Sequence, residues 1–263
     1  LACLLKSGAR DSVHSAIRPA SIPVPRAQRF SPLPRCARAW LVLIEVDNLA
    51  GGRAGLQLFD GLSFTLRPGE ALRISGPNGT GKSTLLRSLA GLTPAMGGAS
   101  RMPPETLLYT GHGDGLKSAL STRENLAFWA GLYGDASEHT LSHALERFDL
   151  TGLAERRIAE LSAGQRRRAS LARLALSARP LWCLDEPTTS LDPAQSARFE
   201  AILAAHLIAG GGAIVASHLE VAPCTAELDL SDYQARRALP DDLFAMEDVA
   251  ADEAPGQTRR GTL

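Results

Sequence analysis

The hydrophobic positions of this 263-residue chain alternate between short apolar runs and segments in which apolar residues recur at helical spacing. Four apolar runs predict strands, at 71–74, 107–112, 180–184 and 213–216. Leucines at positions 85, 86, 89 and 92 predict a helix after the first strand. Ser121 and Ser162, each followed three residues later by Glu or Gln, predict two further helix starts. We expect Phe128 and Trp129, on the helix after Ser121, to pack in the core.

The two ends of the chain lack this periodicity. Residues 1–42 carry seven basic residues against one acid, Asp11, among scattered Pro and Ser. Three explanations stay open for this segment: upstream sequence wrongly included before the true start, an organellar transit peptide, or a disordered tail. Residues 236–263 are rich in Asp and Glu and predict a second disordered tail.

The composition is that of an ordinary soluble protein, with 44% hydrophobic and 21% charged residues, and the length suits one domain with a sizeable core. The formal net charge is zero, so nothing argues for a nucleic-acid partner and we expect none. Apolar runs such as 40–44 and 213–216 are far shorter than the roughly 20 residues that span a bilayer. The four cysteines form no CxxC pair, which favours buried free thiols in a reducing compartment.

The segment 76–83 has the sequence Gly-Pro-Asn-Gly-Thr-Gly-Lys-Ser and fits the GxxxxGKS pattern of phosphate-binding loops. Its glycines let successive backbone N–H groups point inward around a triphosphate, and the helix that begins near Lys82 adds the positive end of its dipole. We expect Lys82 to reach the outer phosphates and the Ser83 hydroxyl to ligate Mg²⁺. The predicted nucleotide-binding residues here are Gly76, Pro77, Asn78, Gly79, Thr80, Gly81, Lys82, Ser83 and Thr84.

The strand predicted at 180–184 ends in two acids, Asp185 and Glu186. Adjacent positions at a strand end point in different directions, so one carboxylate can bind a metal ion while its neighbour accepts a proton from an attacking water. We therefore expect Asp185 to ligate Mg²⁺ and Glu186 to act as general base. A solvated acidic turn is the alternative.

The segment 161–165, Leu-Ser-Ala-Gly-Gln, precedes a predicted helix that carries three arginines at 166–168. Ser162 and Gln165 fit a capping box, so the segment can simply start a helix. The same helix end, with Ser162 and Gly164 exposed, also suits an anion such as the γ-phosphate of a nucleotide on a second subunit.

These motifs, in this order, resemble those of the ABC ATPases. Leu-Ser-Ala-Gly-Gln resembles the ABC signature LSGGQ, and its Ser162 lies 80 residues after Lys82 (82 to 162). By the same resemblance, Asp192 belongs to the D-loop, and His218 is the switch histidine that contacts the γ-phosphate. The resemblance runs from Leu43 to Gln234.

The resemblance implies an α/β fold of the P-loop NTPase type, with a mixed β-sheet core flanked by helices, an antiparallel β subdomain and a small helical lobe. The ATPase domain would span 43–235 and its lobe about 115–175. ATP and Mg²⁺ are the implied cofactors. Two copies would pair head to tail when ATP binds, and hydrolysis would release them. The residues that contact ATP across the pair would be Ser162, Gly164 and Gln165, and the catalytic residues Lys82, Glu186, Asp192 and His218.

Several phrases resemble one subfamily, the ATP-binding subunits of the haem exporter in the cytochrome c maturation system. They are Tyr-Thr-Gly-His at 109–112, Arg-Glu-Asn-Leu-Ala-Phe-Trp at 123–129, the run of three arginines after the signature, and Leu-Trp at 181–182. The resemblance implies a peripheral subunit at the cytoplasmic face of the bacterial inner membrane, bound to integral membrane subunits. Its ATP hydrolysis would serve haem export or the release of a haem-loaded chaperone.

Three other functions stay open: an ATPase subunit of another ABC exporter or importer, a soluble ABC ATPase of DNA repair or translation, and a nucleotide-binding structural subunit with weak activity. The 80 residues between Lys82 and the signature leave no room for the coiled-coil, zinc or duplicated modules of the second class. Intact Lys82, Asp185, Glu186 and His218 argue against the third.

Three features depart from the family patterns: the Q-loop, the residue expected to stack on adenine, and position 189. His112 occupies the place of the Q-loop glutamine, and Gly113 stands where the subfamily usually has Gln. We expect either that His112 replaces the missing amide at the metal or that turnover is slow. Arg53 stands where the wider family has an aromatic residue that stacks on adenine, and its guanidinium plane can stack instead. Thr189 stands where the subfamily often has Ala.

Overall fold

The computed structural model describes residues 42–235, so the predictions for residues 1–41 and 236–263 lie outside the described residues. The described strands are β1 (Ile44–Arg53), β2 (Leu56–Leu66), β3 (Ala71–Ser75), β4 (Gly97–Arg101), β5 (Leu107–Thr110), β6 (Leu181–Asp185), β7 (Gly212–Ala216) and β8 (Ala226–Asp229). The helices are α2 (Lys82–Leu89), α3 (Thr122–Tyr133), α4 (Glu138–Arg147), α5 (Ala163–Leu171) and α6 (Pro193–Ile208), with short 3-10 helices η1 (Thr151–Leu153), η2 (Ile158–Glu160), η3 (Ala172–Leu176) and η4 (Leu230–Tyr233).

Five strands form a parallel sheet in the order β5-β6-β7-β3-β8. All four predicted strands belong to this sheet, because short apolar runs suit strands that are buried on both faces. A separate antiparallel sheet has the order β2-β1-β4. The predicted α/β P-loop fold is therefore confirmed, with its parallel and antiparallel strands in two sheets.

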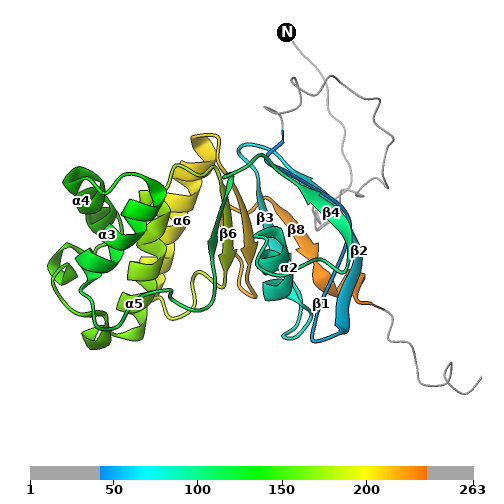
Figure 1. Cartoon of the computed structure of the whole chain (residues 1–263), viewed down its shortest axis with the longest axis horizontal. Helices are drawn as coiled ribbons and strands as arrows, with labels where there is room; N and C mark the ends of the chain where they lie inside the picture. The colour runs from blue at the N-terminus through cyan, green and yellow to red at the C-terminus, as the bar shows by residue number, and fades with distance from the viewer. Residues whose placement is uncertain (1–41, 236–263) are drawn as a thin grey trace, which may run out of the picture.

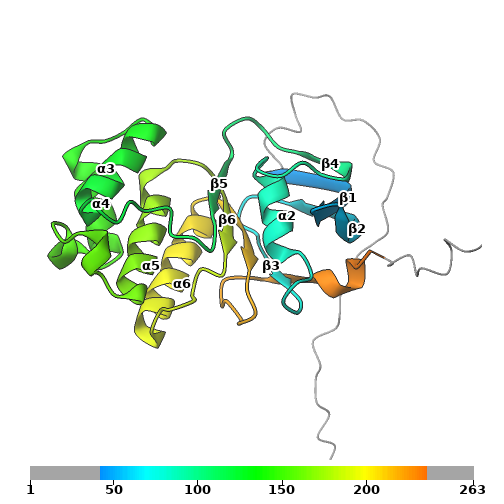
Figure 2. The same cartoon turned by 60° about the horizontal axis from the view of Figure 1, so that its bottom comes forward.

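Helices α3, α4 and α5 lie on one side of the parallel sheet, and the antiparallel sheet lies on the opposite side (Figures 1 and 2). These three helices fall within the segment 115–175 that was predicted as a helical lobe. Both predicted capping boxes are present, with Ser121 and Glu124 at the start of α3 and Ser162 and Gln165 at the start of α5.

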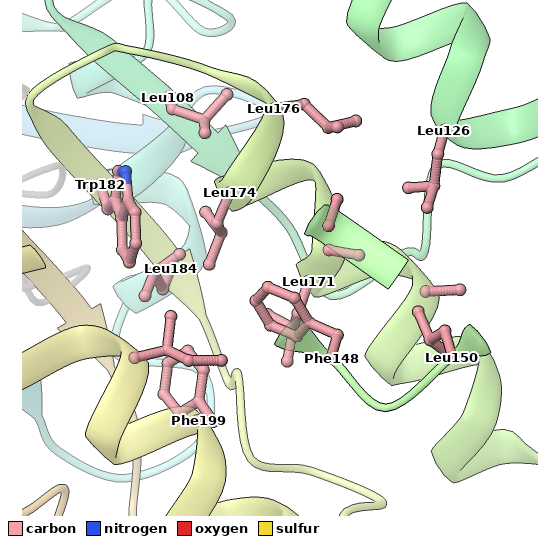
Figure 3. Close-up of a cluster of buried hydrophobic side chains, with 14 of the residues drawn as sticks. Leu108, Leu126, Phe148, Leu150, Leu171, Leu174, Leu176, Trp182, Leu184 and Phe199 are labelled. Carbon is pink, nitrogen blue, oxygen red and sulfur yellow. The ribbon is translucent and has the colours of Figure 1, made fainter. Parts of the chain in front are cut away.

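Strand β6 separates two hydrophobic clusters. Trp182 and Leu184 belong to the cluster on the helical side, where Figure 3 shows them beside Leu174 and Phe199. Leu181 and the fully buried Cys183 belong to the cluster that contains α2 and the antiparallel sheet. The prediction of a buried thiol is confirmed for Cys183, and burial raises the pKa of its thiol far above the ordinary value.

The prediction for Phe128 was wrong, because its side chain is 47% exposed. Leu126 and Ala130 point from α3 into the core, whereas Phe128, two residues from each, lies on the outer side of the helix. Lys117 Nζ lies 5.0 Å from the centroid of its ring. Trp129 is partly buried and packs against the core, as predicted.

The turn between β1 and β2 brings Arg53 to the end of its strand. The turn has two residues, Ala54 and Gly55, with φ values of 53° and 80°, as in hairpin turns of the tightest kind. Behind it, the buried Phe59 ring lies so close to Gly51 that a Cβ built on Gly51 would stand 2.3 Å from Phe59 Cζ. The Phe59 ring of β2 therefore packs against β1 at this point only because position 51 lacks a side chain.

We predict that Gly51→Ala lowers the free energy of unfolding by roughly 1–3 kcal/mol, because the enclosed Phe59 ring cannot move away from the added methyl group. Thermal unfolding followed by circular dichroism measures the change. Gly131→Ala is the control, since a Cβ at this position of α3 meets no atom within 4 Å. The control should be neutral or slightly stabilising, and an equally stable Gly51→Ala variant would contradict the prediction.

Candidate active site

The phosphate loop connects β3 to α2, as the sequence predicts. Gly76, Gly79 and Gly81 have φ values of 124°, 88° and 105°, a region that residues with a side chain rarely adopt. Helix α2 begins at Lys82, and no side chain caps its first turn. The backbone N–H groups at this helix end are therefore free of side-chain partners and suited to an anion.

Lys82 lies inside the loop and not in solvent. Its side chain is 8% exposed, and Nζ donates hydrogen bonds to the carbonyl oxygens of Gly76, at 2.5 Å, and Pro77, at 3.1 Å. The Thr80 hydroxyl donates to the same Pro77 oxygen at 2.9 Å. These bonds stabilise the loop and keep the ammonium group at its centre.

The two predicted acids lie at the end of β6, in different surroundings. Asp185 is 2% exposed, and its Oδ2 atom has no hydrogen-bond partner among the described residues. A buried carboxylate oxygen without a partner is costly unless a cation or donor approaches it. The surroundings of Asp185 therefore fit a divalent metal ion.

Glu186 has a φ of 49°, which is unusual for a residue with a long side chain. Its backbone N–H donates to the Ala216 carbonyl on β7 at 2.8 Å. Its Oε1 atom lies 2.9 Å from Nδ1 of His218, but the two atoms do not form a well-aligned hydrogen bond. Burial raises the pKa of the Glu186 carboxyl, and the charges of His218 and Lys82 offset only part of this rise.

These groups share one cleft of about 650 Å³. Ten of the residues predicted for the site line it: Asn78, Gly79, Gly81, Lys82, Ser83, Thr84, His112, Asp185, Glu186 and His218. Gly76, Pro77 and Thr80 belong to the loop but do not line the cleft, and Thr80 is buried. The phosphate loop, the two acids and the histidine thus come together within one chain.

Four further residues line the cleft, none of which was predicted as a site residue: Ala54, Leu56, Leu58 and Thr189. Leu56 and Leu58 stand two residues apart on β2, so they face the same side of the strand as each other. Leu56 is 50% exposed, and the nearby Phe59 ring is buried in the core. Arg53 lines the cleft together with these two leucines, and among the described residues no Phe, Tyr or Trp lines it.

The signature residues line a different groove. Ser162, Gly164, Gln165 and Asp192 surround a groove of about 310 Å³ outside the nucleotide cleft. Asp192 accepts a hydrogen bond from the Gln195 N–H at 2.8 Å and so caps α6. The structure does not bring these four residues to the phosphate loop of the same chain.

Gly164 is required for the contact between this helix end and the D-loop. A Cβ built on Gly164 would lie 2.7 Å from the Ser190 carbonyl oxygen, and Ser190 itself has a φ of 68°. The start of α5 and the D-loop therefore meet backbone to backbone, beside the exposed Ser162 hydroxyl.

The side chains of the described residues do not form a complete set of metal ligands by themselves. Within residues 42–235 no group of three or more His, Cys, Asp or Glu could hold a metal ion. Ser83 and Asp185 both line the cleft and offer oxygen ligands, the type that Mg²⁺ prefers when phosphates complete its coordination.

None of the helices within residues 42–235 has the length and apolar character needed to span a membrane.

Known proteins resemble the chain over most of its length. The cytochrome c biogenesis ATP-binding export protein CcmA of Rhodobacter capsulatus is 49% identical over 197 residues, which are 74% of this chain and 91% of that protein. The protein of the same name from Ruegeria pomeroyi is 48% identical, over 76% of this chain and 96% of the relative. CbiO1 of Clostridium perfringens, part of the ABC transporter complex CbiONQ, shares the fold, with a TM-score of 0.62 at 22% identity over 80% of this chain and 93% of that chain.

The fold and the site together define an ATP-binding cassette, a P-loop ATPase whose signature lies apart from its phosphate loop. The family model described as ABC transporter matches residues 59–189. The chain belongs to the ABC transporter family, in the group of the cytochrome c biogenesis ATP-binding export proteins CcmA.

We predict that Glu186→Gln raises the thermal unfolding midpoint at pH 8. Because burial raises the pKa of Glu186 in the folded protein, the wild type loses stability as the pH rises through that pKa, and the neutral amide does not. The difference in unfolding midpoint between the variant and the wild type should shrink as the pH falls toward the ordinary pKa of a glutamate side chain. Thermal unfolding at a series of pH values from 5 to 8 measures it.

Glu146→Gln is the control for this experiment, because Glu146 is an exposed residue of α4. It should unfold like the wild type at both ends of the series. A Glu186→Gln midpoint below that of the wild type at pH 8 would show that the attraction of Lys82 and His218 outweighs burial.

Proposed function

We propose that this protein is the ATP-hydrolysing subunit of an ABC transporter complex in c-type cytochrome biogenesis. The observation that carries the proposal is the shared cleft, in which Lys82, Asp185, Glu186 and His218 converge from three strand ends. The identity of almost one half to CcmA proteins supports the cytochrome role. In this role ATP hydrolysis drives haem export or the release of a haem-loaded chaperone.

The loop residues bind the nucleotide phosphates. The uncapped N–H groups at the start of α2 and the Lys82 ammonium neutralise the outer phosphates. Arg53, Leu56 and Leu58 lie on the wall of the cleft that β1 and β2 form, and the base packs against them. Arg53 stacks on the adenine through its guanidinium plane.

Ser83 and Asp185 hold Mg²⁺, and the unpartnered Oδ2 atom of Asp185 supports this assignment. The positive charge of Mg²⁺ at Ser83 and Asp185 would stabilise the negative charge that develops during phosphate transfer. Glu186 accepts the proton of the attacking water. Its raised pKa makes it a stronger base than an exposed glutamate, and His218 beside it orients the carboxylate and contacts the γ-phosphate.

The separate location of the signature supports a head-to-tail dimer. Ser162, Gly164 and Gln165 of one copy cover the phosphates bound in the cleft of the other, and Asp192 of the D-loop lies at the same interface. ATP closes the pair, because contacts between the γ-phosphate and the second copy exist only in the closed state. Integral membrane subunits hold the complex at the cytoplasmic face of the inner membrane and respond to this closure.

The proposed role of Glu186 predicts that Glu186→Gln lowers the rate of ATP hydrolysis by roughly 10²- to 10⁴-fold. The amide keeps the shape of the side chain but cannot accept the proton. Phosphate release is measured with the chain co-expressed with its candidate membrane subunits, and ATP binding is measured separately. Glu146→Gln on α4 serves as control, and ATP hydrolysis that persists in Glu186→Gln would refute the role of the base.

The missing Q-loop amide generates a second prediction: Gly113→Gln raises kcat. His112 is exposed and lines the cleft, and a Cβ at Gly113 meets no atom within 4 Å, so a longer side chain fits there. Gly113→Ala is the matched control, since it stiffens the backbone equally but adds no amide. An unchanged kcat in Gly113→Gln, or the same increase in both variants, would contradict this interpretation of the amide.

A further inference from the structure

A single buried arginine of the signature helix contacts the backbone around the catalytic acids. Arg167 lies on α5 and is 4% exposed. Its Nη2 donates to the carbonyl oxygens of Asp185 and Glu186, both at 2.7 Å, and its Nε donates to that of Pro187 at 3.2 Å. Its Nη1 donates to the Gly111 carbonyl at 3.1 Å. Four carbonyl groups thus accept from one guanidinium.

Arg167 forms no ion pair within residues 42–235, so the carbonyl dipoles are its direct partners. The planar, forked guanidinium suits this task because it presents several N–H groups in fixed directions. A buried cation that bonds only to backbone oxygens fixes the course of the main chain. Arg167 therefore acts on the backbone position of Asp185 and Glu186 and does not pair directly with their carboxylates.

The backbone that Arg167 contacts is the segment where Glu186 adopts its positive φ. One further bond fixes this residue from the sheet, between its N–H and the Ala216 carbonyl. Arg167 fixes the opposite side of the same peptide unit through the Asp185 oxygen, and it fixes the next two units through the oxygens of Glu186 and Pro187. Loss of these bonds would allow the turn to relax to a more favourable φ and would redirect the Glu186 side chain.

The two neighbouring arginines do not reach this segment. Arg166 donates to the Leu161 carbonyl at 3.0 Å and approaches Asp114 only at 4.0 Å. Arg168 pairs with Asp149 at 2.7 Å, on another side of the helix. Among three consecutive arginines, Arg167 is the one whose guanidinium lies at the end of β6.

We propose that Arg167 is a positioning residue for ATP hydrolysis. Its guanidinium sets the backbone of 185–187 so that the Glu186 carboxylate points into the nucleotide cleft, and it ties this arrangement to α5 and to the loop that carries His112. The inference rests on the proposed role of Glu186 as general base, and it predicts that Arg167 acts on turnover through Glu186 alone.

The test compares Arg167→Gln and Arg167→Lys with the wild type, in the full chain co-expressed with its membrane subunits. We expect Arg167→Gln to lower kcat roughly 10- to 100-fold, the size of effect that a small displacement of a catalytic group produces, while KM for ATP stays within about threefold. Arg167→Lys keeps the charge and some of the donors and should recover part of the loss. Arg179→Gln is the control. Arg179 also donates to a backbone carbonyl, but to that of Leu107 at the start of β5, whereas Gly111 follows the other end of this strand.

The decisive measurement is the double variant with Glu186→Gln, followed by release of labelled phosphate so that low rates are resolved. If Arg167 acts through Glu186, Arg167→Gln lowers the residual rate of Glu186→Gln no further. A second loss of the same size would overturn the inference, and so would a change in KM alone or an unchanged kcat. If neither Arg167 variant folds, the residue is structural and the inference fails.

The proposed function and this inference can fail separately. Activity that persists in Glu186→Gln refutes the general base, and the role of Arg167 with it. An inactive Glu186→Gln together with a fully active Arg167→Gln refutes only the positioning role.

Discussion

The parallel pairing of β3, β7 and β6 determines where Lys82, the two acids and His218 stand in the nucleotide cleft. Ile74 pairs with Ala216, and Ala216 pairs with Asp185, so the three strands end level with one another. Parallel strands end at the same edge of a sheet, and ligands of open α/β sheets bind there. The phosphate loop, the two acids and the histidine therefore meet without any long side chain crossing the sheet.

The enclosure of β6 on both faces gives its acidic end unusual surroundings. Burial removes water from Asp185 and Glu186, which leaves one oxygen of the first without a partner and raises the pKa of the second. Both effects act against folding stability, and both suit groups that bind a cation and accept a proton. The hydrophobic packing of Trp182 and Leu184 fixes the strand firmly enough to tolerate them.

The sequence was sufficient for four of the five strands of the parallel sheet, the phosphate loop and both capping boxes, because each of these depends on local spacing and on residue types with one strong preference. It did not predict β8, whose short segment Ala-Glu-Leu-Asp has no apolar run. It was insufficient where tertiary packing determines which side chains are buried and which reach the cleft. Helical spacing cannot tell which of three consecutive arginines turns inward, and it placed Phe128 in a core that it does not enter. Leu56 and Leu58 look like ordinary strand residues until the hairpin turn brings them to the cleft.

The pairing partners of β3 also affect how this protein is made. Ala71 pairs with Ala213, and Leu72 pairs with Ala226, so both neighbours of the strand are synthesised more than 140 residues after it (213 minus 71). Contacts this distant in sequence form late and slow folding. During translation β3, the apolar strand that leads into the phosphate loop, therefore remains unpaired. Until β7 leaves the ribosome, the nascent chain exposes an unpaired strand edge of the kind that promotes aggregation.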